Sequence, residues 1–179
     1  MTLSTGPVAH LSRYHDDYGT CDRCHAVLLI YSEDLTPDQI SAQLGIFPTS
    51  FIQKGRWSLF SKSPHPSVGR INGWFLSTED EIRSKDLQRH LDYLISRLTF
   101  RVDRLKTLQA RPGVGMRVHC SWWSNYGDGA PTVWPIHMKA FADMNIELTF
   151  EFACLGPEDD SQSVPAPFLP NNGPTNPAA

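Results

Sequence analysis

The sequence has little net charge and no long hydrophobic segment. Its 16 Lys and Arg residues are nearly balanced by 19 Asp and Glu residues, which leaves a formal net charge of -3. A chain with so little positive charge has no general electrostatic attraction for nucleic acid. No run reaches the ~18 apolar residues that a membrane-spanning helix needs. We therefore expect neither a nucleic-acid-binding protein nor a membrane protein.

Signals for export and for a disulfide framework are also missing. The N-terminus, MTLSTGPVAHLSRYHDDYGT, has no basic start followed by an apolar core, so we expect no secretory signal. The 4 cysteines among 179 residues are too few for a disulfide-rich scaffold. Together, these two absences predict a protein of the reducing cytoplasm.

A C-x-x-C-H motif is formed by Cys21, Cys24 and His25, and this pattern attaches c-type haem. Haem attachment normally follows export, for which the sequence has no signal. Zinc is a second interpretation, since the two cysteines have ligand spacing, but no second ligand pair follows to complete a tetrahedron. We therefore expect no cofactor and retain the three residues only as secondary metal candidates. The favoured interpretation is two ordinary thiols that precede the first strand.

The composition divides the chain into three parts. Residues 1–21 are polar and aperiodic, and we expect a flexible N-terminal arm. Residues 156–179, GPEDDSQSVPAPFLPNNGPTNPAA, are rich in proline and poor in apolar side chains, which is typical of a disordered tail. Residues 22–155 are predicted to form a single α+β domain.

Apolar periodicity predicts strands and helices in alternation within this domain. The clearest signal is a helix over 37–44, with a Thr36–Gln39 capping box, Pro37 in its first turn and Gly45 as its stop. A longer helix is expected to begin after a Ser84 cap and to carry an apolar stripe from Leu87 to Leu98, with His90 at the flank of that stripe. The predicted strands are 25–32, 51–60, 72–78, 115–123 and 146–155, and the remaining helices are 101–110 and 135–144.

Two strand–helix–strand units predict a ferredoxin-like fold, with an antiparallel or mixed sheet of about five strands and helices packed mainly on one face. The first strand, HAVLLIYS, is apolar throughout, so we expect it at the centre of the sheet and covered on both faces. Side chains alternate in polarity over 115–123 and 146–153. The alternation predicts one inward set, formed by Met116, Val118 and Cys120 with Ile146, Leu148, Phe150 and Phe152. It predicts one outward set, formed by Arg117, His119, Ser121 and Trp123 with Glu147, Thr149 and Glu151. This alternation predicts that part of one sheet face meets water or a partner.

Three segments in this order, EDLTPDQISAQLGIFPTSFIQKG, GWFLSTED and DLQRHLDYLISRL, resemble the bacterial family called domain of unknown function 4279. The resemblance covers residues 24–153 and implies an α+β fold, but the family name implies no activity. Arg56 stands where the family pattern has an acidic residue. The matching features are Leu44-Gly45, Pro48-Thr49, Lys54-Gly55, Trp74, Ser77 with Glu79, and His90-Leu91.

No catalytic motif stands out. The sequence contains no G-x-S-x-G, no P-loop and no G-x-G-x-x-G, so we assign no catalytic residue and lean against an enzyme. Outward-facing residues of the two late strands form a candidate binding surface, with Trp123 as its anchor. A solvated sheet face with weak ion pairs is the competing interpretation. The candidate surface residues are Arg117, His119, Trp123, Glu147, Glu151, Lys54 and Arg56.

Two functions remain open. The favoured one is a non-enzymatic protein-interaction module, immunity-like or regulatory, whose partner is another protein. The alternative is a small-molecule or zinc-binding protein, enzymes included. This alternative would use His119 with Glu147 or Glu151, or zinc held by Cys21 and Cys24.

Overall fold

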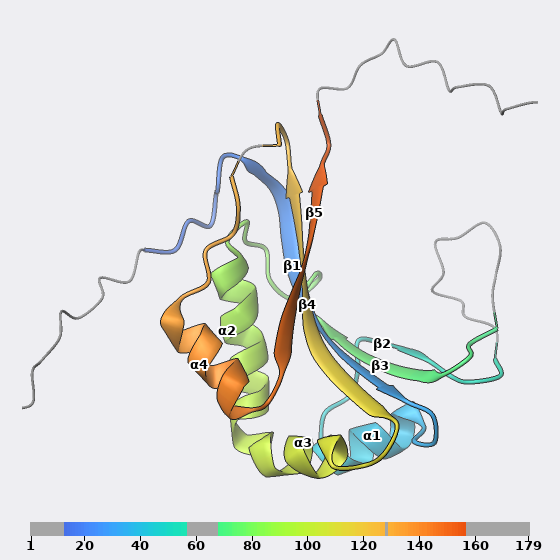
Figure 1. Cartoon of the computed structure of the whole chain (residues 1–179). Coiled ribbons are helices and arrows are strands. Elements are labelled where there is room, and N and C mark those ends of the chain that lie inside the picture. Colours follow the sequence, from blue (N-terminus) through green and yellow to red (C-terminus); the bar gives the residue numbers. More distant parts are fainter. Residues whose placement is uncertain (1–12, 57–67, 128, 157–179) are drawn as a thin grey trace, which may run out of the picture.

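A mixed five-stranded sheet forms the centre of the protein (Figure 1). The computed structural model describes residues 13–56, 68–127 and 129–156. The strand order is β2-β3-β1-β4-β5; β4 and β5 are parallel, and the other neighbours are antiparallel. The predicted α+β class is thus confirmed, and of the two sheet types expected, antiparallel or mixed, the structure has the mixed one. The strands are β1 (Cys21–Ser32), β2 (Ser50–Ile52), β3 (Asn72–Ser77), β4 (Val114–Ser124) and β5 (Glu147–Cys154).

The helices are α1 (Pro37–Leu44), α2 (Leu87–Leu98), α3 (Val102–Gln109) and α4 (Pro135–Asp143), with a 3-10 turn η1 (Thr99–Arg101) before α3. At α1, the Thr36 and Gln39 side chains each accept from the other residue's backbone N–H, as predicted. At α2, however, the cap is Asp86, whose carboxylate accepts from the Gln88 N–H at 3.0 Å. Ser84 instead accepts from the Asp86 N–H at 3.0 Å. None of the helices in the described ranges combines the length and apolar character that crossing a bilayer requires.

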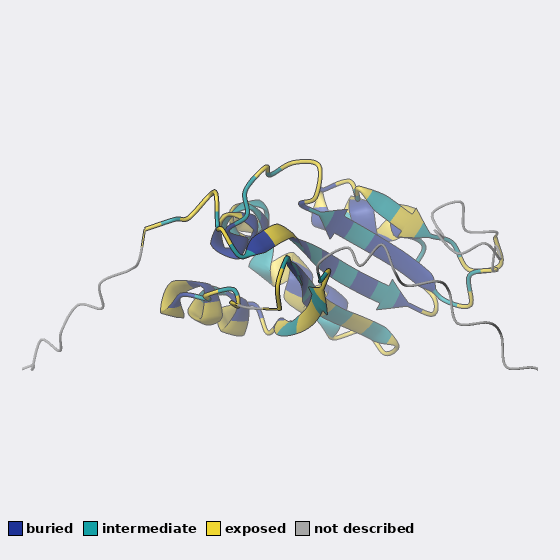
Figure 2. Cartoon of the chain, turned by 90° about the horizontal axis from the view of Figure 1, so that it is seen from above, coloured by how far each residue is buried: buried dark blue, intermediate teal, exposed yellow. Residues whose placement is uncertain are grey.

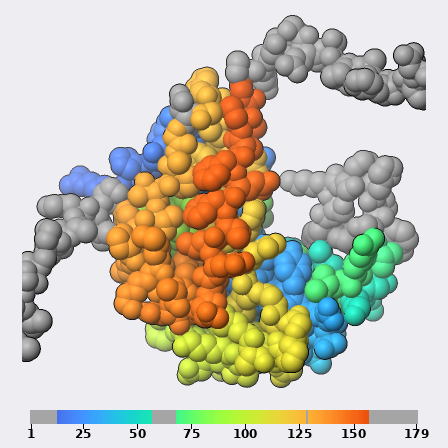
Figure 3. All heavy atoms as spheres, viewed as in Figure 1, coloured from blue at the N-terminus to red at the C-terminus, as the bar shows by residue number. Residues whose placement is uncertain are grey.

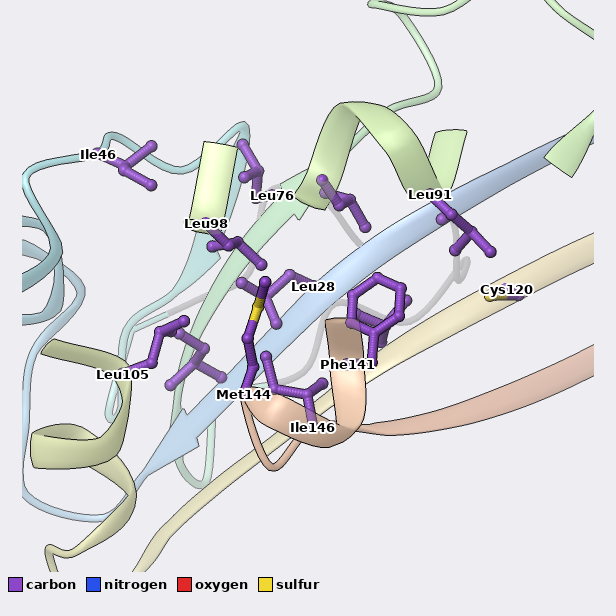
Figure 4. Packing of buried hydrophobic residues seen from close by; sticks show 14 of the residues in the cluster. Leu28, Ile46, Leu76, Leu91, Leu98, Leu105, Cys120, Phe141, Met144 and Ile146 are labelled. Atoms are coloured by element: carbon purple, nitrogen blue, oxygen red, sulfur yellow. The ribbon is translucent and has the colours of Figure 1, made fainter. Parts of the chain in front are cut away.

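The core lies between the sheet and the helices (Figure 4). Alternate side chains of β1, such as Leu28 and Ile30, are fully buried there beside residues of all four helices. The Trp74 indole N–H donates to the Ser41 hydroxyl at 3.0 Å, which joins β3 to α1. The predicted inward positions on β4 are confirmed for Val118 and Cys120, whereas Met116 is partly buried.

Several side chains differ in burial from the sequence-based expectation. The other face of β1 is only half-buried, at Val27 and Leu29 for example, so β1 is not covered on both faces (Figure 2). Phe150 and Phe152 are 41% and 58% exposed, because β5 is an edge strand and forms part of the outer surface (Figure 3). His90 is fully buried rather than on a helix flank.

The described part of the N-terminal arm, residues 13–20, contacts α2. Asp16 accepts from Arg89 at 3.0 Å, and the Arg89 guanidinium carbon lies 3.7 Å from the centre of the Tyr14 ring. The Tyr14 hydroxyl donates to Asp92. The first twelve residues and the predicted tail from 157 onward lie outside the described residues. So does the predicted strand beyond Arg56, whose described part ends at Ile52.

Candidate binding surface

The sheet has an open face, formed by the β1, β4 and β5 side chains that point away from the core. Strand pairing sets Arg23 opposite Trp123, Arg117 opposite Glu147, and Ser121 between His25 and Glu151. Because strand side chains alternate, these residues project on the side opposite Leu28 and Val118. The open face is defined here by Arg23, His25, Arg117, His119, Ser121, Trp123, Glu147, Thr149 and Glu151.

Trp123 is held at one end of the open face by two neighbours on β1. Its ring stacks with the His25 imidazole at 5.3 Å between centroids and a 28° interplanar angle. The Arg23 guanidinium carbon lies 4.4 Å from the ring centroid, within the range of a cation–π interaction. Trp123 remains partly exposed. The indole is therefore a pre-oriented aromatic surface that a partner can still reach.

His119 lies near the middle of the open face and has a partner for each ring nitrogen. Nε2 is 3.2 Å from a Glu151 carboxylate oxygen, and Nδ1 is 3.1 Å from the Thr149 hydroxyl oxygen. A His–Glu pair between neighbouring strands was expected from the sequence, and the structure contains it. Ser121, which was expected to be exposed on this face, is buried. The reason is that His25 and Glu151 flank it in the strand register.

The open face carries charges of both signs. Arg23 and Arg117 contribute positive charge, and Glu147 and Glu151 contribute negative charge. Burial lowers the pKa of His25 below its ordinary value, and the nearby Arg23 and His119 add to this effect, while Glu79 and Glu151 oppose it. A lowered pKa keeps the imidazole neutral at pH 7, so Trp123 stacks on an uncharged ring.

The two basic candidates, Lys54 and Arg56, lie away from the other candidate residues. They follow β2, which is separated from β4 by β3 and β1. The register also places the Ile52 end of β2 level with Gly115 at the start of β4, whereas Trp123 is near the end of β4. The structure thus brings together the five β4 and β5 candidates and leaves the two basic residues outside.

The C-x-x-C-H motif lies within β1 rather than before it, because the strand begins at Cys21. Cys24 is buried toward the core, where its Sγ lies 3.7 Å from the Ser84 carbonyl, while His25 points to the open face. Burial raises the pKa of both thiols, which disfavours the thiolate that zinc needs. Over the described ranges, no three or more His, Cys, Asp or Glu side chains are grouped to hold a metal ion.

Sequence reasoning missed three members of the open face, namely Arg23, Thr149 and, as a surface residue, His25. The available signal was alternation: if β1 is extended backward from His25, Arg23 falls on the same face. The apolar run begins at His25, so no local signal marks Arg23 as part of the strand. Thr149 was placed on the correct face, but its contact with His119 depends on the parallel register of β4 and β5.

A comparison with protein families finds one whose description is "Domain of unknown function (DUF4279)", and its model matches residues 22–155. Comparisons with curated proteins and with solved structures find no match. The matched range contains the whole sheet except Cys21, and therefore every residue of the open face.

Proposed function

The chain belongs to the DUF4279 family, and from that premise we propose that it is a non-enzymatic protein-interaction domain, immunity-like or regulatory, that binds another protein through the open face. The single observation that carries this proposal is the partly exposed Trp123, held by Arg23 and His25 on a face that presents charges of both signs.

For the whole fold, we infer a ferredoxin-like arrangement with helices mainly on one face, supported by the strand order β2-β3-β1-β4 and one shared core. The free cysteines support a reducing, cytoplasmic location.

A protein partner fits this surface better than nucleic acid or a metal ion. Trp and Arg are enriched among the residues that dominate the binding energy of protein interfaces. Mixed charges set register and specificity against a complementary protein surface. Nucleic acid would instead require a predominance of positive charge, and Glu147 and Glu151 offset Arg23 and Arg117.

The alternative, a small-molecule-binding or enzymatic role for the open face, depends on the His119–Glu151 pair. A histidine oriented by a carboxylate is a common general base. The pair is flanked by the Thr149 and Ser121 hydroxyls, but Ser121 is buried and Thr149 donates to the Val118 carbonyl at 3.3 Å. No activated nucleophile is therefore formed, and this role is the less favoured of the two.

Site-specific photo-cross-linking followed by measurement on purified proteins tests the proposal. A benzophenone amino acid is placed at Arg117 on the open face and, as a control, at Phe100 on η1, which is 90% exposed. We expect the Arg117 position, and not the Phe100 position, to cross-link a protein in cells that express the chain. That protein is then purified and its affinity for the chain is measured by calorimetry.

Trp123→Ala is expected to weaken this affinity by at least about 30-fold, the loss typical of a central interface tryptophan. Phe100→Ala removes an exposed aromatic group from outside the open face and should leave affinity unchanged. Both variants should have melting temperatures close to that of the parent protein. Equal affinity of a folded Trp123→Ala variant, or cross-linking from Phe100 alone, would show that the open face is not the interface.

A further inference from the structure

β5 forms one edge of the sheet, and its outer side is unpaired. Among the described residues, no strand pairs with the side of β5 that faces away from β4 (Figure 1). The strand runs over Glu147–Cys154 and keeps an unbroken register with β4, so no bulge interrupts it. The other edge strand, β2, spans only Ser50–Ile52. A long, regular edge presents a row of free backbone N–H and C=O groups, which is a template for pairing with another strand.

Backbone groups of alternate residues point to this free edge. In a parallel ladder, every second residue directs its N–H and C=O to the neighbouring strand. The Leu155 N–H donates to the Ser124 carbonyl at the end of β4 at 2.9 Å, so the odd-numbered residues of β5 face β4. The even-numbered residues therefore direct their backbone groups outward, at Leu148, Phe150, Phe152 and Cys154.

Two large apolar side chains lie along this edge and are exposed. Phe150 is level with the buried Cys120, and Phe152 is level with the buried Trp122, so both rings project on the core side of the sheet. The two rings stack on each other at 6.1 Å between centroids. Edge strands of soluble proteins are commonly protected by lysine, proline or a bulge, and β5 has none of the three. An edge of this kind favours a partner strand.

Two copies of β5 can pair with each other without breaking the alternation of their side chains. In an antiparallel pair, opposite residues point to the same face, so the core-side residues of one copy must meet those of the other. A two-fold axis through Phe150 satisfies this condition and pairs residues 147–153 of both copies. Phe150 then lies opposite Phe150 of the second copy, and Phe152 lies opposite Leu148. Apolar side chains thus contact one another across the axis, and the phenylalanine rings lose exposure to water.

The two glutamates of β5 favour this register over its neighbours. With the axis at Phe150, Glu151 lies opposite Thr149 and Glu147 lies opposite an alanine, so no two charges are directly opposite. With the axis at Glu151, its carboxylate would face the same carboxylate of the second copy, and like charges directly opposite are destabilising. With the axis at Thr149, Glu147 would face Glu151. An axis further along the strand would pair fewer residues.

We propose that the protein associates with a second copy of itself by antiparallel pairing of the two β5 strands. The two five-stranded sheets join into one continuous sheet. Because the two-fold axis is perpendicular to the sheet, the open faces of both copies lie on the same side of it. Each copy contributes one strand to the contact, so we expect a dissociation constant in the micromolar range. The pairing does not depend on the proposed protein-binding role of the open face.

Sedimentation velocity of the full chain tests the proposal. We expect the mass to rise from that of one chain, 20.1 kDa, toward twice that value as the concentration increases through the micromolar range. Phe150→Lys sets two positive charges opposite each other at the axis and should raise the dissociation constant at least about tenfold. Phe100→Lys makes the same change of charge at an exposed site outside β5 and should associate like the parent chain.

The melting temperature of each variant shows whether it is folded. If Phe150→Lys does not fold, Phe152→Lys decides. Phe152 is the more exposed of the two residues, and it meets Leu148 of the second copy in the same register. A lysine at this position should also raise the dissociation constant at least about tenfold, because it places a charge against an apolar side chain.

Disulfide trapping in a Cys154→Ser background tests the register. Phe150→Cys places a thiol on the axis in both copies, with Cα atoms about 5.5 Å apart, which is within the range of a disulfide. Phe152→Cys is the matched control, because its two copies are displaced by about 14 Å along the strands, beyond that range. Glutathione disulfide should link the first variant into a covalent dimer and leave the second unlinked.

Three outcomes would overturn the proposal. The full chain stays monomeric up to about 1 mM; the folded lysine variants of β5 associate as tightly as the parent chain; or Phe150→Cys forms no more covalent dimer than Phe152→Cys. The first outcome would leave the edge to a different partner, such as an extended peptide of another protein. The second would place the contact between copies outside β5, and the third would show that it is not centred on Phe150.

Discussion

His90 of α2 links three segments through a chain of buried hydrogen bonds. The Ala26 N–H donates to the Thr78 hydroxyl oxygen at 3.0 Å, and that hydroxyl lies 2.6 Å from His90 Nδ1. The other ring nitrogen, Nε2, is 2.9 Å from the Ser84 carbonyl oxygen. A carbonyl can only accept, so Nε2 carries the proton and Nδ1 accepts from Thr78. The neutral imidazole satisfies every group in this chain.

The stability of the protein should therefore depend on the protonation of His90. Burial lowers the pKa of His90 below 6.5; His25 adds to this effect, while the Ser84 carbonyl and Asp86 oppose it. Between that lowered pKa and 6.5, the unfolded state binds more protons, so stability rises with pH. The contribution of His90 is fully present above about pH 6.5 and decreases as the pH falls toward the folded-state pKa.

His90→Gln tests this dependence by urea unfolding at about pH 7.5 and about pH 5. The variant should be less stable than the parent at the higher pH by about 1–3 kcal/mol, because buried partners are left unsatisfied. Its stability should change less between the two pH values. His25→Gln separates the effect of the second histidine with a lowered pKa. If the parent and His90→Gln lose the same free energy of unfolding between the two pH values, His90 is not the cause of the pH dependence of stability.

At the scale of secondary structure elements, local sequence signals predicted most of the fold. The capped helix α1 was predicted with its observed bounds, because Thr36, Pro37, Gln39 and Gly45 act on the backbone within a few residues of each other. The α2 cap was misplaced by two residues. Ser84 and Asp86 are both good caps, and the choice depends on Asp86 also receiving the N–H of His15 from the distant arm.

The candidate site could be predicted only in part. Alternation placed Arg117, His119 and Trp123 on one face correctly. The stacking of His25 on Trp123 and the burial of Ser121 depend on which strands are neighbours and in what register. No local pattern encodes this neighbour order or register, so neither feature could be derived from the sequence.

The α1 cap gives a prediction at this scale. Thr36→Ala removes the hydroxyl that accepts from the Gln39 N–H, and the free energy of unfolding should fall by about 1 kcal/mol. Thr36→Ser keeps the acceptor and should remain close to the parent. Chemical denaturation of the three proteins measures the difference. If the Ala and Ser variants are equally stable, the capping box makes no net contribution here.

At the scale of the whole molecule, the described residues end near Gly156 with β5 complete. We predict that a chain truncated after Gly156 melts within about one degree of the full chain, because the remaining residues have few apolar side chains to bury. Differential scanning calorimetry of the two proteins measures this. A clear drop in melting temperature would show that the segment containing Phe168 and Leu169 stabilises the domain. Phe168→Ala in the full chain would then locate the contact.

The pairing of β1 has a consequence for how the protein is made. This strand, the first of the described elements, pairs over its whole length with β4, and Cys21 lies opposite Ser124. During synthesis, β1 emerges first and cannot complete its pairing until most of the domain has left the ribosome. The edge of β1 that faces β4 stays unpaired for that interval, even where β3 has already paired with the other edge, and an unpaired strand edge favours aggregation or chaperone binding. The time for which the new chain needs protection therefore increases with the number of residues that separate β1 from β4, its neighbour in the sheet.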